Sequence, residues 1–535
     1  MHSVLHSAKT YDIIPWYYIK ERYEIIMELT AFALYFVAML AIGVFFFVSA
    51  KGKGEGEKDY FLGGRQMGPW VTAMSAQASD MSAWLLMGLP GSIFAFGFGQ
   101  AWIGIGLAIG TALNWIFVAR RLRKFSKASG DSITLPQYLS NRFMTANPAL
   151  KIICAIVFLV SFTLYVASAF SAGATVFHQL IPQISLEVEM IIFVAILLIY
   201  TFLGGYKAVC WTDFFQGLLM LAALLVVPIA IVAFKETDLT LLGQTITNEA
   251  TGTSYSFVAN FFNASWQEIL SGLGWGLGYF GMPHILVRFM AIEKPSMVKK
   301  SATVAIIWVV LSLGAAIIIA YLGRILAVNF TGTEIPFAQY MLENGLQETI
   351  FIQLSRMVFP AFIAGLLLAA IIAASMSTAD SQLLVASSSF TSDIYKPFIR
   401  KQASQKELLW IGRLVVVVVA IVAYFIASSE GKGAQAIMDM VGNAWGLFGA
   451  AFGPVVILSL FWKRFTYKGA LAGIIVGAVV DIVWLIWLAG TGVYEIVPGF
   501  IAGAIAAVIV TLLDKKPSEE VLAIYEQATD NSIDD

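Results

Sequence analysis

Residues 75–86 read SAQASDMSAWLL and place a carboxylate, that of Asp80, inside a long apolar run. A charge at the centre of a lipid bilayer costs a few kcal/mol or more unless a partner compensates it. A second polar stretch, ASMSTADSQ, interrupts another apolar run at residues 374–382. The chemistry that these two stretches could share is the binding of a small cation by oxygen atoms.

The spacing of the second stretch supports this interpretation. Ala374, Ser377 and Thr378 stand at i, i+3 and i+4, so they share one face of a helix. Two hydroxyls and a carbonyl there, opposite carbonyls freed by a helix break near Asp80, would form the oxygen cage that a hard cation prefers. The alternative is that each hydroxyl bonds only to a carbonyl one turn earlier.

Composition places these stretches in a membrane protein. The chain has 535 residues, of which 59% are hydrophobic and 13% charged, with a net charge of −1. Soluble domains carry about 25% charged residues, so the chain is predicted to be an all-α polytopic membrane protein. The balanced charge points to no nucleic-acid partner. Cys154 and Cys210 lie in or beside apolar segments and are expected to be small core residues.

Apolar runs of roughly 20 residues predict about thirteen transmembrane helices. The expected spans are 29–50, 70–97, 100–119, 149–180, 188–206, 212–234, 267–292, 302–327, 352–386, 408–428, 435–462, 469–490 and 495–513. Residues 29–513 would form one transmembrane domain between an N-terminal extension, 1–28, and a short polar tail, 514–535. Met27 is an alternative start to Met1.

Lys and Arg residues gather in the loops that follow odd-numbered spans. Because cytoplasmic loops are enriched in Lys and Arg, this bias predicts an N-terminus outside and a C-terminus in the cytoplasm.

Two of the expected spans contain helix breakers. The run 70–97 carries SAQASDMSAW and then GLPGS, and the run 267–292 contains five glycines within GLGWGLGYFG and then Pro283. Glycine and proline weaken a helix by about 1 and 3 kcal/mol per residue. Broken helices at matching positions indicate an inverted-repeat transporter, with repeats at about 70–234 and 267–462. The alternative for the glycines is close helix packing.

Several strings together resemble the sodium/solute symporter family, and within it the branch that transports proline. The strings are SAQASDMSAWLLMGLPG, DYFLGGR, GLGWGLGYFGMPH, AVCWTD, ASMSTADSQLLV and AWGLFGAAFGPVV. They occur in order from about residue 28 to beyond 510. The resemblance implies a LeuT-like core of five plus five helices. It also implies sodium-coupled uptake of L-proline by alternating access, in the cytoplasmic membrane of a bacterium.

The resemblance also implies roles for individual residues. Sodium would be held by Ala78, Met81, Ala374, Ser377 and Thr378, and Asp80 would serve sodium coupling. The substrate would meet Tyr165, Trp275, Tyr279 and Pro283, with Ser79, Ser82 and Trp84 lining the same cavity. Na⁺ would be a coupling ion, and neither a cofactor nor an obligate protein partner is implied.

Two positions depart from the family pattern. Met282 stands where the proline branch often has Gln, which removes an amide from the pocket wall. Asp380 stands where relatives often have Ser, near a second sodium site of some relatives. Asp213, Asp380 and Ser381, with Ser377, are therefore a candidate second cation site. The favoured alternative is that Asp380 faces water at the cytoplasmic exit.

Other function classes are weaker. An intramembrane enzyme would need a nucleophile or metal motif, and neither HExxH nor GxSxG occurs. A sensor would need a larger tail, and a channel would conduct without a substrate. Within transport, the alternative substrate is another small solute, such as a different amino acid, pantothenate or a sugar.

Overall fold

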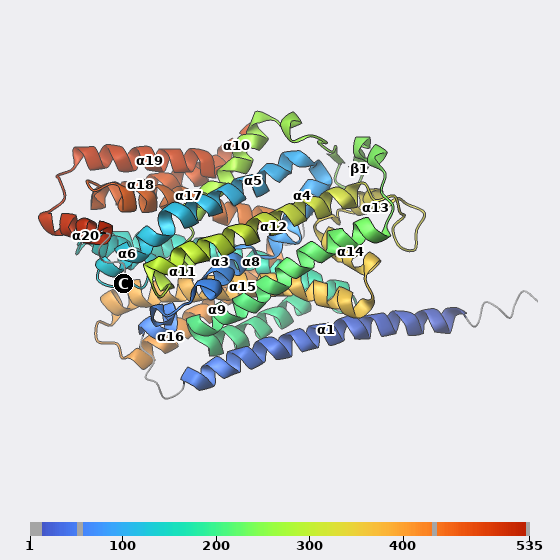
Figure 1. Cartoon of the computed structure of the whole chain (residues 1–535), viewed down its shortest axis with the longest axis horizontal. Coiled ribbons are helices and arrows are strands. Elements are labelled where there is room, and N and C mark those ends of the chain that lie inside the picture. Colours follow the sequence, from blue (N-terminus) through green and yellow to red (C-terminus); the bar gives the residue numbers. More distant parts are fainter. Residues whose placement is uncertain (1–12, 51–56, 431–435, 531–535) are drawn as a thin grey trace, which may run out of the picture.

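The computed structural model describes residues 13–50, 57–430 and 436–530. Long helices run side by side along the longest axis of the molecule (Figure 1). The helices are α1 (Ile13–Ala50), α2 (Glu57–Leu62), α3 (Pro69–Asp80), α4 (Gly88–Phe96), α5 (Phe98–Leu113), α6 (Arg120–Ala128), α7 (Leu135–Arg142), α8 (Ala149–Leu180), α9 (Leu186–Phe234), α10 (Trp266–Gly274), α11 (Pro283–Ala291), α12 (Val298–Arg324), α13 (Phe337–Glu343), α14 (Ile350–Val358), α15 (Ala361–Ser389), α16 (Gln405–Glu430), α17 (Ala436–Phe461), α18 (Tyr467–Val483), α19 (Ile496–Leu513) and α20 (Glu519–Thr529).

Ten helices in the described ranges are long and apolar enough to cross a membrane. The thirteen expected spans differ from these ten at three places. Two are the runs 70–97 and 267–292, which the structure divides into short helices. The third is the run 188–206, which forms the first part of α9 and is separated from the rest by a kink at Gly205, where φ is 59° and ψ is −179°.

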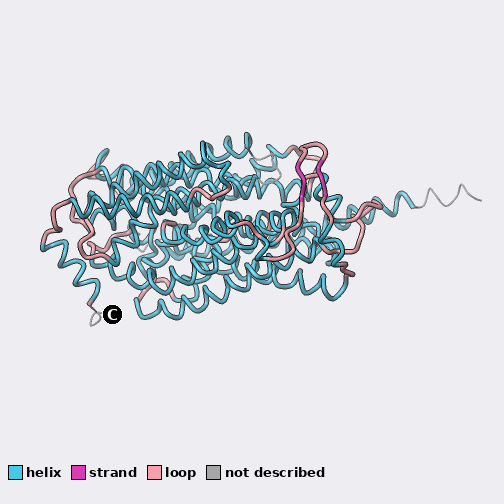
Figure 2. The backbone as a smooth tube through the Cα atoms, turned by 90° about the horizontal axis from the view of Figure 1, so that it is seen from above, coloured by secondary structure: helices cyan, strands magenta, loops and turns pink. Residues whose placement is uncertain are grey.

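The two ends of the bundle carry different elements. At one end, here called the basic end, Lys463 contacts Glu526 of α20 at 2.6 Å, and Lys124 donates to the Asp530 carbonyl at 2.5 Å. The other end, here called the distal end, carries the hairpin of β1 (Ile246–Asn248) and β2 (Thr253–Tyr255). Figure 1 shows α6 and α20 at one end and β1 and α13 at the other. Figure 2 shows the same hairpin from above.

Two terminal boundaries differ from the expectation. Helix α1 begins at Ile13 and not near residue 29, so part of the expected N-terminal extension continues the first span. The tail after Leu513 includes α20, whose Ser518 caps the helix by accepting a hydrogen bond from the Val521 N–H at 3.5 Å. Helix α20 packs against α6 at the basic end.

Both expected helix breaks are confirmed. Helix α3 ends at Asp80, and Met81 has non-helical angles of φ −82° and ψ 72°. A 3₁₀ turn at 83–85 separates this break from α4. In the second broken span, α10 ends at Gly274, a 3₁₀ segment covers 275–280, and α11 begins at Pro283. Proline at the first position of α11 fits the break, because its missing N–H is not needed there.

The glycines of the second broken span also serve close packing, which was the alternative explanation. A Cβ on Gly276 would lie 2.3 Å from the Gly106 carbonyl oxygen of α5. A Cβ on Gly272 would lie 2.5 Å from Cβ of Trp102. Backbone therefore meets backbone between α5 and the segment 272–276, an approach that only glycine permits.

Candidate functional site

Helices α3 and α15 meet at the predicted sodium cage. The Ser377 hydroxyl lies 2.8 Å from the Ala78 carbonyl oxygen and 3.2 Å from that of Ala374. The Thr378 hydroxyl is buried without a hydrogen-bond partner in the described part of the chain. Three of the five predicted oxygen atoms are thus adjacent, and a fourth is unsatisfied one residue away. The backbone of Met81, which would supply the fifth, lies in the break that follows α3.

Asp80 is the last residue of α3 and is 1% exposed. Tyr279 donates its hydroxyl to Asp80 Oδ2 at 2.5 Å, and Tyr165 donates to the Asp80 backbone carbonyl at 3.3 Å. The other carboxylate oxygen, Oδ1, has no hydrogen-bond partner among the described residues. Two residues predicted to contact substrate therefore also hold the residue predicted to serve sodium coupling.

Aromatic rings from three segments form one wall beside this cluster. The ring centroids of Trp84 and Trp275 are 6.2 Å apart, and those of Trp275 and Trp445 are 6.3 Å apart. Trp445 also donates its indole N–H to the Trp275 carbonyl at 2.8 Å and packs edge-on against Tyr279 at 5.1 Å. Sequence reasoning gave Trp445 no role, although it belongs to the string AWGLFGAAFGPVV.

The remaining predicted substrate residues lie in or next to the two breaks. Ser82 accepts a hydrogen bond from the Trp84 N–H at 3.4 Å and so caps the 3₁₀ turn. Ser79 donates back to the Ala76 carbonyl at 3.2 Å, within its own helix. Pro283 begins α11, directly after the buried Met282. The backbone of both breaks is thus near the aromatic wall.

The candidate second cation site already contains a positive charge from the protein. Arg288 of α11 donates from Nη2 to Asp213 Oδ2 at 2.9 Å and to Ser381 Oγ at 2.5 Å, and from Nε to Ser75 Oγ at 2.8 Å. Arg288 and Asp213 are 1% and 0% exposed. A buried charge needs such a partner, because desolvation is otherwise costly. Sequence reasoning missed Arg288, although an arginine in the apolar run PHILVRFMA was a usable signal.

The expectation that Asp380 faces water is wrong. Its side chain is fully buried, and its Oδ1 accepts a hydrogen bond from the Ser381 hydroxyl at 3.3 Å. The helix α15 that carries it packs against α1, α3, α8, α9 and α16, and every residue of α15 from Leu367 to Ser389 is buried.

A network of hydrogen bonds and ion pairs around Arg65 and Asp131 lies at the basic end. Arg65 Nε lies 2.9 Å from Asp131 Oδ1, and Nη2 donates to the Ser132 carbonyl at 2.7 Å. Arg65 also donates to the Met290 carbonyl, which ties the loop to the end of α11. Burial alone would raise the pKa of the Asp131 carboxyl, but the hydrogen bond from Lys58 and two nearby cations bring it below its ordinary value. The carboxylate thus stays charged and holds the loops together.

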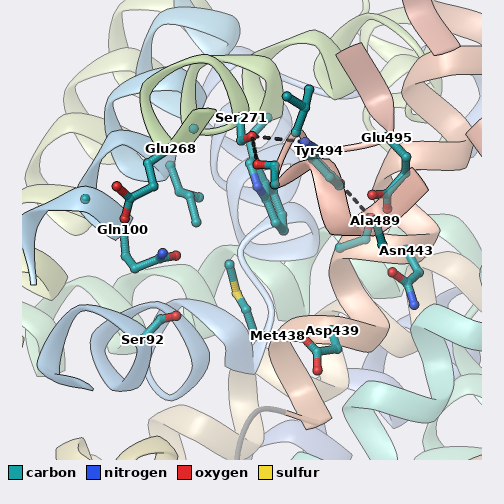
Figure 3. A pocket seen from close by; sticks show the side chains of 17 residues that line it. Ser92, Gln100, Glu268, Ser271, Met438, Asp439, Asn443, Ala489, Tyr494 and Glu495 are labelled. Carbon is teal, nitrogen blue, oxygen red and sulfur yellow. Dashed lines mark hydrogen bonds between the residues drawn. The ribbon is translucent and has the colours of Figure 1, made fainter. Parts of the chain in front are cut away.

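At the distal end, a cavity of about 360 Å³ reaches Trp275 (Figure 3). Tyr494, in the loop between α18 and α19, stacks on the Trp275 ring with centroids 5.1 Å apart. Its hydroxyl donates to the Gly442 carbonyl at 2.6 Å, and its N–H donates to Ser271 Oγ at 2.9 Å. The predicted substrate residue Trp275 is therefore approached from the distal end, and Tyr494 covers it there.

Comparisons with known proteins agree with this architecture. The model of the sodium:solute symporter family matches residues 60–477. The chain is 42% identical over 506 residues to the sodium/proline symporter of Escherichia coli, covering 94% of this chain and 96% of the relative. It is 43% identical over 487 residues to the high-affinity proline transporter PutP of Bacillus subtilis, covering 90% and 97%.

Among solved structures, a Na⁺-coupled sialic acid symporter in an outward-open state superposes with a TM-score of 0.69 at 21% identity, covering 92% of this chain and 99% of that one. This likeness confirms the LeuT-like fold. The family comprises sodium-coupled transporters and not enzymes. With a family model that matches most of its length, the chain belongs to the sodium:solute symporter family.

Proposed function

We propose that the protein carries out sodium-coupled uptake of L-proline. The observation that carries the proposal is the Ser377 hydroxyl between the carbonyls of Ala78 and Ala374, beside the buried Asp80. An oxygen-only site of this kind suits an alkali cation. Proline is suggested by relatives above 40% identity that are named for its transport.

Sodium would bind where α3 breaks and would join it to α15. The carboxylate of Asp80 would offset the ion's charge. Because Tyr279 and Tyr165 both donate hydrogen bonds to Asp80, they would link the sodium site to the substrate cavity. Sodium would then raise substrate affinity, and by linkage the substrate would raise sodium affinity by the same factor.

The substrate would lie along the aromatic wall. Its carboxylate would meet backbone N–H groups freed at the helix breaks, as in other transporters with interrupted helices. The apolar pyrrolidine ring would be enclosed by Trp275, Tyr279 and Trp84, since aromatic side chains bury large apolar areas.

The basic end would face the cytoplasm, because positively charged loops are retained there. The Arg65–Asp131 network then closes the cytoplasmic side, while the distal cavity approaches Trp275 from outside. One charge moving through ~100 mV releases about 2.3 kcal/mol. A tenfold sodium gradient adds about 1.4 kcal/mol, so one sodium ion can drive a roughly few-hundredfold accumulation of substrate.

Uptake of labelled proline into proteoliposomes tests the proposal. Uptake should require an inward sodium gradient and should fall when unlabelled proline is added. Met282 stands where the resemblance to the proline branch implies a glutamine, so a different small solute is the second candidate. Competition by other amino acids, pantothenate and sugars separates the two. Proline uptake that is indifferent to external Na⁺ would contradict sodium coupling.

A further inference from the structure

The distal cavity has a strongly acidic lining. Glu268, Asp439 and Glu495 all line it, and the described lining residues include no Lys, Arg or His. Figure 3 shows these carboxylates arranged around the cavity that leads to Trp275. Carboxylates that line a cleft with apolar walls raise the local concentration of cations.

The carboxylates of Asp481 and Glu495 both lie close to Gly446. A Cβ on Gly446 would lie 3.1 Å from Asp481 Oδ1 and 3.3 Å from Glu495 Oε1. Asp481 is 1% exposed and Glu495 is 8% exposed. The space above Gly446 is therefore bordered by two oxygen atoms that both carry negative charge when ionised.

The buried carboxylate is incompletely satisfied. Asp481 Oδ1 has no hydrogen-bond partner in the parts of the chain that the structure describes. A buried polar atom without a partner costs free energy, and a buried charge costs more. A positively charged group in the space above Gly446, which both carboxylates border, would stabilise them when they are ionised.

The position of the pair connects it to the substrate cavity. Glu495 follows Tyr494 directly in sequence, and the Tyr494 ring stacks on Trp275. A cation held at Glu495 thus lies beside the residue that covers the substrate cavity. In the described residues no group of three or more acidic, His or Cys side chains could chelate a metal, so a multivalent ion is not favoured.

We propose that Asp481, Glu495 and the acidic cavity in front of them form an antechamber that binds a small monovalent cation before it reaches the aromatic wall. The bound cation is Na⁺ or the ammonium group of a zwitterionic substrate. This choice of ligand rests on the proposed function, whereas the acidity and occupancy of the antechamber can be measured without any transport assay.

Charge-selective thiol labelling tests the proposal on the full chain in proteoliposomes. The reporter thiol is introduced by Asn443→Cys, because Asn443 is half-buried and lines the cavity. The two native cysteines are buried. The labelling rates of a cationic and an anionic methanethiosulfonate reagent are compared. Burial raises the pKa of the Glu495 carboxyl to about 7, so the labelling rates are compared at a pH well above this value.

We expect the ratio of cationic to anionic rates to exceed that of a small free thiol by about tenfold. Glu495→Gln and Asp481→Asn should each reduce the ratio about threefold. Glu334→Gln is the matched control, because Glu334 is exposed in a loop and does not line the cavity. Gln100→Cys provides a second reporter position if Asn443→Cys does not fold.

The bound cation is identified by repeating the labelling with added NaCl and with added proline. Slower cationic labelling in NaCl than in choline chloride of equal ionic strength identifies Na⁺, and slowing by proline without sodium identifies the substrate ammonium. Either result supports the antechamber. A ratio like that of a free thiol, or one that Glu495→Gln leaves unchanged, would overturn it. A high ratio unaffected by both sodium and proline would also overturn it, because it would show attraction without binding.

Discussion

Helices α3 and α15 meet at two places, one helical turn apart. The two places differ in how a buried carboxylate beside them is compensated. At Ala78 and Ser377, acceptor oxygens cluster near the carboxylate of Asp80. At Ser75 and Ser381, the guanidinium of Arg288 supplies the donors. The first place has acceptors in excess, as a site for a mobile cation requires, whereas the second carries its own cation. The difference shows how one helix pair can combine a binding site with a permanent crosslink.

The largest expected effect on uptake concerns the carboxylate of Asp80. Asp80→Asn keeps the shape of the side chain but removes the charge that would offset sodium, so sodium-driven uptake should fall at least about a hundredfold. Initial uptake rates, normalised to folded protein, provide the measurement. Asp393→Asn is the control, because Asp393 is also buried but is bonded to Thr134 at 2.7 Å, away from the cage. Normal uptake with an unchanged sodium requirement would remove the proposed role of Asp80.

The second prediction concerns the guanidinium group of Arg288 at the second place. Arg288→Met leaves Asp213 buried without its ionic partner, so the protein should lose about 3–5 kcal/mol of stability. Thermal unfolding in detergent measures the change. The double variant Arg288→Met with Asp213→Asn should recover much of the loss, since it leaves no uncompensated charge. If the single variant is as stable as the parent, the interpretation of this cluster as a structural crosslink is wrong.

The third prediction concerns the hydroxyl groups of the first place. Ser377→Ala and Thr378→Val should each raise the sodium concentration for half-maximal uptake about tenfold, because each removes an oxygen ligand worth about 1.5 kcal/mol or more to a charge. Uptake at saturating sodium should change little. Ser375→Ala is the matched control, because the Ser375 hydroxyl bonds back to the Ile371 carbonyl at 3.0 Å. An equal effect in all three variants would indicate a general weakening of α15.

The smallest expected effect concerns the aromatic wall. Trp445→Phe keeps an aromatic ring but loses the hydrogen bond to the Trp275 carbonyl, which contributes about 1 kcal/mol. The proline concentration for half-maximal uptake should therefore rise about fivefold, with the sodium requirement nearly unchanged. A shift confined to the sodium requirement would assign Trp445 to the cage and not to the wall.

Local features of the site were predictable from the sequence. The breaks near Met81 and before Pro283 follow from glycine, proline and polar residues in apolar runs. The shared face of Ala374 and Ser377 follows from helical periodicity. These features depend on neighbours in sequence, which a single chain displays directly.

Features that depend on distant segments were not predictable. The pairing of Arg288 with Asp213 joins residues from different helices, and a lone sequence does not show which helices touch. The same limit hid the contacts of Trp445 and Tyr494 with Trp275. It also made the burial of Asp380 unexpected, because the exposure of α15 depends on the helices that surround it.

The glycine contact between α5 and the segment 272–276 has a consequence for the speed of conformational change. Because the facing atoms are largely main chain, few side-chain rotamers would have to interchange for the two segments to shift relative to each other. Interdigitated side chains would instead have to disengage at each step. We expect that larger residues there would force the two main chains apart, and that turnover would slow even where the fold tolerated the substitution.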